Sequence, residues 1–236
     1  MTPGQLVKAM AIALDVPVET VVQHDRNLAV AGLRTTGARG RNAPDVTPLD
    51  AARLLVATLG SVRTKDSVET VRAFEDAKFR PEQSEVAKSK PDLVRGGPPS
   101  SRNPLYFGGF FDPAIMSLAP DHNFVEAIAS LIHHATVDLE NQFERFGPLS
   151  VTCSSPELRA GIKHSSIYGP GAVYFPKKRP ELKNYYGIIQ RREASGVTIV
   201  LLGKAFRDGG LPFDGMQGAL DALTVKKASA KSKKAT

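Results

Sequence analysis

Two small groups of side chains in this sequence have residue types that could perform catalysis or bind a metal. His133, His134 and Asp138 fall in one helical stretch, where residues four apart share a face. A third ligand at useful spacing is missing, and the flanking apolar residues favour packing. Cys153 and His164 could form a thiol nucleophile and its base, but a lone cysteine in an apolar strand is usually a small buried hydrophobe. We therefore predict no enzyme, metal site or cofactor.

Another set of polar side chains lies on a predicted helix from Val18 to Ala31. Gly32 is well placed to end this helix in a left-handed conformation. Val21 and Leu28 can face the core, and the rest of the surface carries the polar residues Glu19, Thr20, Gln23, Arg26 and Asn27. Amide side chains can bond adenine, arginine can bond guanine or phosphate, and threonine can contact a phosphate or a thymine methyl group.

An arginine-rich loop follows this helix. Its cations are Arg34, Arg39 and Arg41, glycines open it at positions 37 and 40, and no acidic residue occurs before Asp45. A hairpin of this composition suits a phosphate backbone or a minor groove.

A shorter helix is predicted before the polar one. Thr2 can cap it, Pro3 suits its first position, and Gln5 can reach back to the cap. Apolar residues recur at helical spacing up to Leu14, and Pro17 then breaks the pattern. The sequence therefore predicts two short helices joined by a tight turn.

The run from Ala13 to Leu33 resembles the helix-turn-helix of bacterial winged-helix regulators of the MarR-like and ArsR-like kind. The matching positions are Leu14, Val16, Thr20, Val21, His24, Leu28, Ala31, Gly32 and Leu33. The resemblance covers about the first 45 residues, and Asp25 stands where the pattern usually has a buried leucine. It implies a helix in the major groove and a DNA-contacting set of Thr20, Gln23, His24, Arg26, Asn27, Arg34, Thr35, Arg39 and Arg41.

Capping signals place two more helices in the N-terminal region. Thr47 begins a helix over Pro48–Leu59. In winged-helix regulators another helix precedes the helix-turn-helix, and we expect the Pro48–Leu59 helix to take its packing role. Asp66 and Ser67 open another helix that is predicted to end near Phe79. Residues 1–79 are therefore predicted to form a helical winged helix-turn-helix domain.

The rest of the chain is predicted to be a linker, an α+β domain and a tail. Residues 80–104 are polar and rich in Pro and Gly, which indicates a linker. Within 105–224 we expect a long helix at 123–146 and a last helix at 214–223. Between them we expect a small antiparallel sheet with a hairpin turn at 194–196 and five strands, at 149–153, 159–163, 172–175, 186–191 and 197–202. The basic tail, 225–236, is predicted to be disordered.

A basic and aromatic cluster stands out in the second domain. Its cations are Lys177, Lys178, Arg179, Lys183, Arg191 and Arg192, which Glu181 and Glu193 oppose, with Tyr174, Tyr185 and Tyr186 nearby. Such residues on a sheet can hold nucleic acid. A solvated strand connection is the alternative interpretation.

The net charge of +7 is unevenly distributed. Lysines 226, 227, 231, 233 and 234 contribute +5 within the tail, which leaves +2 for residues 1–225. A generally basic surface is therefore not indicated. The tail could add sequence-independent affinity for phosphates, or it could be a solubilising terminus.

Composition is typical of a soluble cytoplasmic protein. The chain has 236 residues, of which 42% are hydrophobic, and one cysteine, which fits a reducing compartment. No apolar run is long enough to span a membrane, and no cleavable secretory pattern is present.

Together these features predict a cytoplasmic, sequence-specific protein that binds double-stranded DNA, a transcriptional regulator of bacterial or mobile-element origin. A homodimer is expected, because one helix-turn-helix contacts few base pairs. The main alternative is a non-enzymatic structural or protein-interaction protein whose N-terminal region is an ordinary helical bundle. A hydrolase or transferase acting through the second domain is the third candidate.

Overall fold

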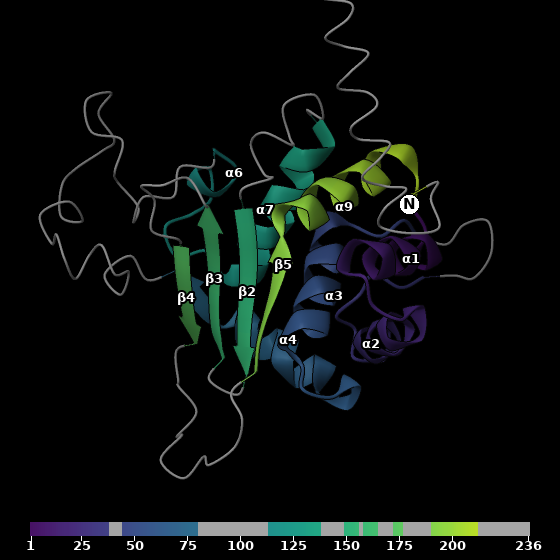
Figure 1. Ribbon diagram of the computed structural model, residues 1–236, viewed down its shortest axis with the longest axis horizontal. Helices are drawn as coiled ribbons and strands as arrows, with labels where there is room; N and C mark the ends of the chain where they lie inside the picture. The colour runs from purple at the N-terminus through teal and green to yellow at the C-terminus, as the bar shows by residue number, and fades with distance from the viewer. Residues whose placement is uncertain are drawn as a thin grey trace, which may run out of the picture.

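The computed structural model describes residues 1–37, 44–79, 113–137, 149–155, 158–164, 172–176 and 190–211. Here the chain forms helices packed against an antiparallel sheet (Figure 1). The fold is therefore mixed helix and sheet, as the sequence indicated. No helix in these segments has the length and apolar character needed to cross a membrane.

The helices and strands of the described residues have the following bounds, and their labels are those of Figure 1. The helices are α1 (Pro3–Leu14), α2 (Val18–Val30), α3 (Pro48–Gly60), the 3-10 turn η1 (Thr64–Asp66), α4 (Ser67–Glu75), α6 (Pro113–Met116), α7 (Phe124–Val137) and α9 (Gly196–Asp208). The strands are β1 (Ala77–Phe79), β2 (Leu149–Ser155), β3 (Arg159–His164), β4 (Ala172–Pro176) and β5 (Gln190–Ser195).

The predicted helix pair is present as α1 and α2. The Thr2 hydroxyl accepts from the Gln5 N–H at 3.3 Å, and the Gln5 side chain accepts from the Thr2 N–H at 2.7 Å, which confirms the predicted cap. After α2, Gly32 has φ 71°, the left-handed conformation expected at this position.

Helix α3 is the central helix of the molecule. Nearly all of its residues are buried, including Leu54, Leu55 and Val56. It packs against α7, α4, α2 and α1, and it also touches β2. A helix that is covered on so many sides belongs to a core and not to a surface layer.

The sheet has the strand order β1-β4-β3-β2-β5, and every neighbouring pair is antiparallel. Residues alternate between its two faces. The face that carries Val151, Cys153, Ile162, Tyr174 and Ala194 is buried, and α3, α4, α7 and α9 contact the strands.

The described residues on both sides of the predicted linker share one core. Strand β1 pairs with β4, and the rings of Phe74 and Phe124 lie 5.6 Å apart. One connected cluster of buried apolar side chains runs from α1 to α9. Residues 1–79 and 105–224 are predicted as separate domains, and their described residues share this hydrophobic cluster.

Several predicted boundaries and one element type were wrong. The helix that begins at Ser67 ends at Glu75, and residues 77–79 form β1. The predicted strand at 197–202 is part of helix α9, and the expected hairpin turn at 194–196 is the junction between β5 and α9. The strand predicted at 186–191 appears as β5 at 190–195, and residues 186–189 lie outside the described residues.

Other predictions fall on residues that the structure does not describe. These are the linker, the end of the long helix, the last helix and the tail, at 80–104, 138–146, 214–223 and 225–236. The first part of the long helix is α7.

Candidate nucleic-acid interface

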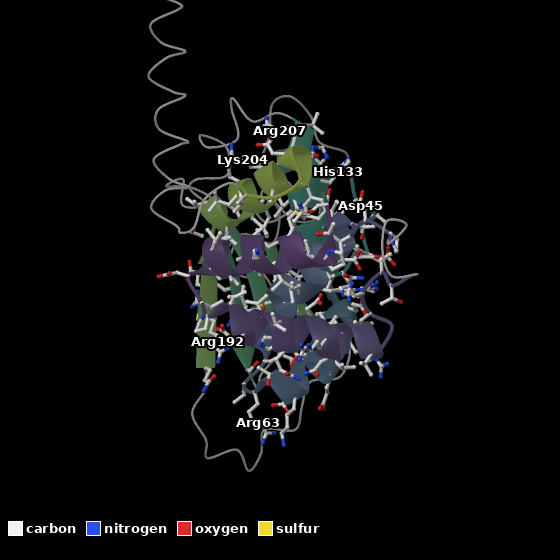
Figure 2. The ribbon with its side chains drawn as sticks, turned by 90° about the vertical axis from the view of Figure 1, so that its right-hand side faces the viewer. Asp45, Arg63, His133, Arg192, Lys204 and Arg207 are labelled. Atoms are coloured by element: carbon white, nitrogen blue, oxygen red, sulfur yellow. The ribbon has the colours of Figure 1, made fainter. Side chains whose placement is uncertain are left out.

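The side of α2 that points away from the molecule is a narrow, mostly polar stripe. Glu19, Gln23, Arg26 and Val30 recur at helical spacing, and all four are exposed. The other sides of α2 pack on α1, α3, η1 and α4. Figure 2 views the molecule from the side on which α1 and α2 lie. Helix α2 is thus packed against α1, α3, η1 and α4 and presents one face to solvent.

Two of the predicted DNA-contacting residues lie on this face. The Gln23 amide nitrogen donates to the side-chain oxygen of Asn27 at 3.2 Å, an exposed contact that costs little to exchange for another partner. Arg26 makes no ion pair or hydrogen bond with the residues that the structure describes. Both side chains can therefore reach a molecule that approaches α2 from solvent.

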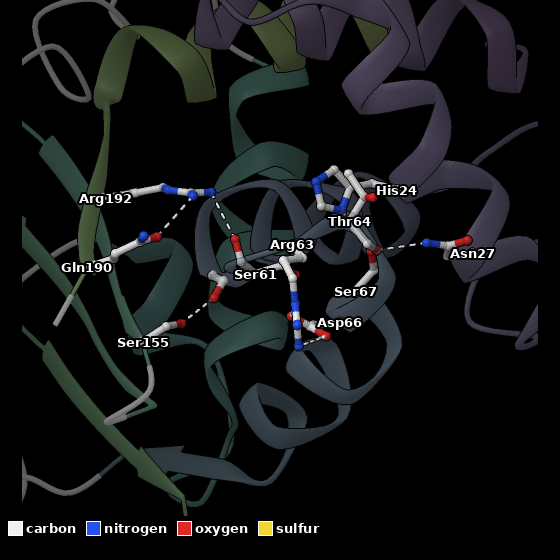
Figure 3. A network of polar contacts seen from close by, with 11 residues as sticks. His24, Asn27, Ser61, Arg63, Thr64, Asp66, Ser67, Ser155, Gln190 and Arg192 are labelled. Carbon is white, nitrogen blue, oxygen red and sulfur yellow. Dashed lines mark hydrogen bonds and ion pairs between the residues drawn. The ribbon is translucent and has the colours of Figure 1, made fainter. Parts of the chain in front are cut away.

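His24 and Asn27 instead connect α2 to the η1–α4 segment (Figure 3). Asn27 Nδ2 donates to the Thr64 carbonyl at 2.7 Å, and His24 Nδ1 lies 2.7 Å from the Ser67 hydroxyl. His24 is only 3% exposed. Burial, together with the positive charge of Arg192, lowers the pKa of His24 to about 4. This placement makes His24 a buried packing residue, contrary to the predicted role in binding DNA.

Asp25 and Arg34 form an ion pair that no local sequence pattern predicts. Arg34 Nε lies 2.8 Å from Asp25 Oδ1, with both side chains largely buried, and Arg34 Nη1 donates to the Thr35 carbonyl at 3.1 Å. Burial raises the pKa of Asp25, although Arg34 opposes this effect. The pair explains an aspartate where the winged-helix pattern has a leucine. It also occupies Arg34, which was predicted to contact phosphate.

Asp50 closes the base of the arginine-rich loop. Its carboxylate accepts from the Thr35 N–H and hydroxyl at 2.7 and 2.9 Å, and from the Thr47 N–H and hydroxyl at 2.7 and 2.8 Å. Burial alone would raise the pKa of Asp50, but these bonds together hold it below its usual value. The two ends of segment 36–46 are therefore tied to one buried carboxylate. The capping signal at Thr47 predicted the bonds between Thr47 and Asp50, but not those between Thr35 and Asp50.

The remaining predicted contacts are less defined. Thr20 is partly buried in the first turn of α2, and Thr35 is engaged by Asp50. Arg39 and Arg41 lie outside the described residues, which stop at 37 and resume at 44. No strand occurs in the described residues on either side, 31–37 and 44–47, so a wing remains a prediction.

The alternative chemical sites have little support in the described residues. Cys153 is 1% exposed in β2, and burial raises the pKa of its thiol far above the usual range, which disfavours a thiolate. His133 and His134 contact each other through their rings at 5.9 Å, and Asp138 lies outside the described residues, as does the side chain of His164. No group of three metal-ligating side chains occurs in the part of the chain that the structure describes.

Comparisons with protein-family models, with curated proteins and with solved structures found no match to this chain. The functional interpretation therefore depends on the geometry of the exposed α2 face and of the elements that hold it.

Proposed function

We propose that this protein binds double-stranded DNA by placing the exposed face of α2 in the major groove. Gln23 and Arg26 contact base edges, because an amide can pair with adenine and a guanidinium with guanine. Arg39 and Arg41, in the adjacent loop, contact the flanking phosphates. The proposal keeps the predicted role of a cytoplasmic, dimeric transcriptional regulator and reduces the base-contacting residues to two.

The observation that supports this proposal best is the way in which α2 is anchored. Its inward edge is held by the His24 and Asn27 contacts, while the neighbouring Gln23 and Arg26 stay exposed. A helix fixed in this way loses little conformational freedom when a duplex binds, and preorganisation of this kind favours affinity. The Asp50 bonds hold Thr35 and Thr47, which flank the arginine-rich loop, at the first turn of α3.

The test is a titration of labelled duplex DNA with the full chain at several salt concentrations. A double variant, Gln23→Ala with Arg26→Ala, should lower the affinity for an enriched target sequence by roughly tenfold or more, since each good base contact contributes about 1–3 kcal/mol. Arg72→Ala removes an exposed arginine from α4 and serves as the charge-matched control. The proposal is wrong if the chain has no affinity for duplex DNA at low salt, or if the two variants behave alike.

A protein-interaction role is the second candidate, and one feature of the same face favours it. Val30 is 91% exposed and Val18 is 38% exposed, at opposite ends of α2. Exposed valines of this kind suit a protein partner better than a duplex. Self-association that Val30→Ser abolishes, in a chain without affinity for DNA, would favour this candidate. Sedimentation velocity measures the self-association directly.

A further inference from the structure

Two consecutive arginines of β5, Arg191 and Arg192, lie on opposite faces of the sheet. Arg192 points toward the helices, where Nη1 donates to the carbonyls of Thr58 and Ser61 at 3.1 and 2.9 Å and Nη2 donates to the Gln190 side chain at 3.1 Å (Figure 3). These bonds satisfy carbonyls at the end of α3 and occupy the guanidinium. Arg191, one residue away, belongs to the opposite face of the sheet and is exposed.

The strand register aligns further cations on that opposite face, which we call the outer face. Arg159 and Arg191 both pair with Ser154, from the two sides of β2. On the other flank Lys78 pairs with Phe175, and Ala160 pairs with Tyr174, so position 175 lies between Lys78 and Arg159. One row therefore crosses all five strands through Lys78, Phe175, Arg159, Ser154 and Arg191.

The cations in this row are evenly spaced. Lys78, Arg159 and Arg191 are each two strands apart, which corresponds to about 10 Å between neighbours and about 20 Å across the row. Lys163 lies four residues from Arg159 along β3, about 13 Å away on the same face, and is exposed. The four residues come from three separate parts of the sequence, and only Arg191 belongs to the basic and aromatic cluster that was predicted from the sequence.

Negative charge is scarce on the outer face. Among its described positions the one carboxylate is Glu193, whose side chain is about half exposed and lies 4.0 Å from Arg191. An exposed pair at this distance contributes little and leaves the arginine able to exchange partners. Ser154 is partly buried between Arg159 and Arg191, and Ser150 is partly buried beside Lys163. The outer face therefore has an excess of positive charge with hydrogen-bonding groups between the cations.

From this arrangement we infer that the outer face of the sheet binds single-stranded nucleic acid through its phosphates. A phosphodiester chain offers regularly repeated negative charge and can follow a row of separated cations in several registers. This surface is distinct from α2, which lies on the other side of the helices from the sheet (Figure 1).

A fluorescence anisotropy titration with a labelled oligothymidylate of about 20 nucleotides tests this inference on the full chain. Lys163→Gln combined with Arg191→Gln should weaken binding by roughly tenfold or more. The salt dependence (the slope of log K against log salt concentration) should become shallower by about 0.7 for each phosphate contact removed. Arg72→Gln combined with Arg207→Gln removes the same charge from α4 and α9 and is the matched control.

A gain-of-affinity variant protects the test against a simple loss of folding. Glu193→Gln removes the carboxylate from the outer face and should strengthen oligothymidylate binding several-fold. Equal weakening by the Lys163/Arg191 and Arg72/Arg207 variants would overturn the inference, as would poly-glutamate or anionic lipid vesicles competing as well as oligothymidylate does at equal charge.

The same set of proteins separates this inference from the proposed function. The Gln23/Arg26 double variant should leave oligothymidylate binding unchanged while it weakens duplex binding. The Lys163/Arg191 variant should show the opposite pattern. If duplex binding fails altogether, the outer-face inference is still decided by the oligothymidylate titrations alone.

Discussion

The ring of His24 has a defined protonation state because of its neighbours. The Ser67 hydroxyl donates to the Thr64 carbonyl and must therefore accept from His24, so Nδ1 carries the proton. Protonation of Nε2 would place a second charge near Arg192 in a buried site, and the pKa of His24 is accordingly about 4. The neutral ring is the form that the fold requires.

This state predicts how stability should depend on pH. The folded pKa of His24 is below the ordinary value of 6.5, so the unfolded chain binds more protons between about pH 6.5 and 4. Its contribution to stability is complete above pH 6.5 and is lost as pH falls toward 4, on the order of 3 kcal/mol. Urea unfolding of His24→Asn, which keeps a donor for Ser67, should show a smaller loss between pH 7 and 4.5 than the original chain.

His122 serves as the internal control for that experiment. Burial also lowers its pKa, and it keeps its own partners, the Ala119 carbonyl and the Tyr174 hydroxyl, in the His24 variant. The remaining acid sensitivity of the variant should therefore come from His122 and other groups. An unchanged pH dependence in His24→Asn would show that His24 is not held neutral by the fold.

At the same scale, sequence reasoning found the polar residues of α2 but not their directions. The helical period orders these side chains around α2 as Arg26, Gln23, Asn27 and His24, from the exposed side inward, yet all four are polar and look alike in the sequence. What divides them is the η1–α4 segment, about 40 residues later, which supplies the partners for the inward pair. That information is not local, so no pattern within the helix could have provided it.

At the scale of elements, the helix ends marked by caps could be predicted from the sequence. The secondary structure of the apolar run at 197–202 could not. The boundaries of α1, α2 and α3 follow from Thr2, Gly32 and Thr47, whose signals act within a few residues. The first part of helix α9 was predicted as a strand because residues 197–202 are mostly apolar and include several β-branched residues. Such a run fits a buried strand and a buried helix equally well, and only the packing against α7 and α1 decides between them.

The packing of α9 against α7 depends on one glycine. A Cβ added at Gly203 would lie 2.5 Å from the Cβ of Ala135 and 2.7 Å from its carbonyl atoms. Because the obstacle includes backbone, Gly203→Ala must push the two helices apart, and we expect a loss of about 1–3 kcal/mol despite the better helix propensity of alanine. Gly4→Ala in α1 meets nothing within 4 Å and should be neutral or slightly stabilising. Chemical denaturation of both variants measures the difference, and equal stabilities would contradict this account of the crossing.

At the scale of the whole molecule, the common core joins the N-terminal helices to the sheet. The side-chain hydroxyl of Ser155 donates to the Gly60 carbonyl, and Arg192 donates to the carbonyls of Thr58 and Ser61, so the end of α3 obtains partners from β2 and β5. The Pro/Gly-rich composition of residues 80–104 predicted a linker between two domains. Composition is a local property, so it could not predict that helices before this segment pack against strands after it. In the described residues, the helices before that segment share their hydrophobic core with the strands that follow it.

A fragment of residues 1–79 should therefore fail to fold by itself. It would expose the face of α3 that packs on α7, leave the ring of Phe74 without Phe124, and remove the β4 partner from β1. We expect narrow amide proton dispersion in its NMR spectrum and no cooperative thermal transition, whereas the full chain should unfold in one transition. The control is a point variant of the full chain, Gly4→Ala, which should keep that single transition. A well-dispersed spectrum and a sharp transition from the fragment would mean that the N-terminal helices are an independent domain, and that their contacts with the sheet add little to the stability of either part.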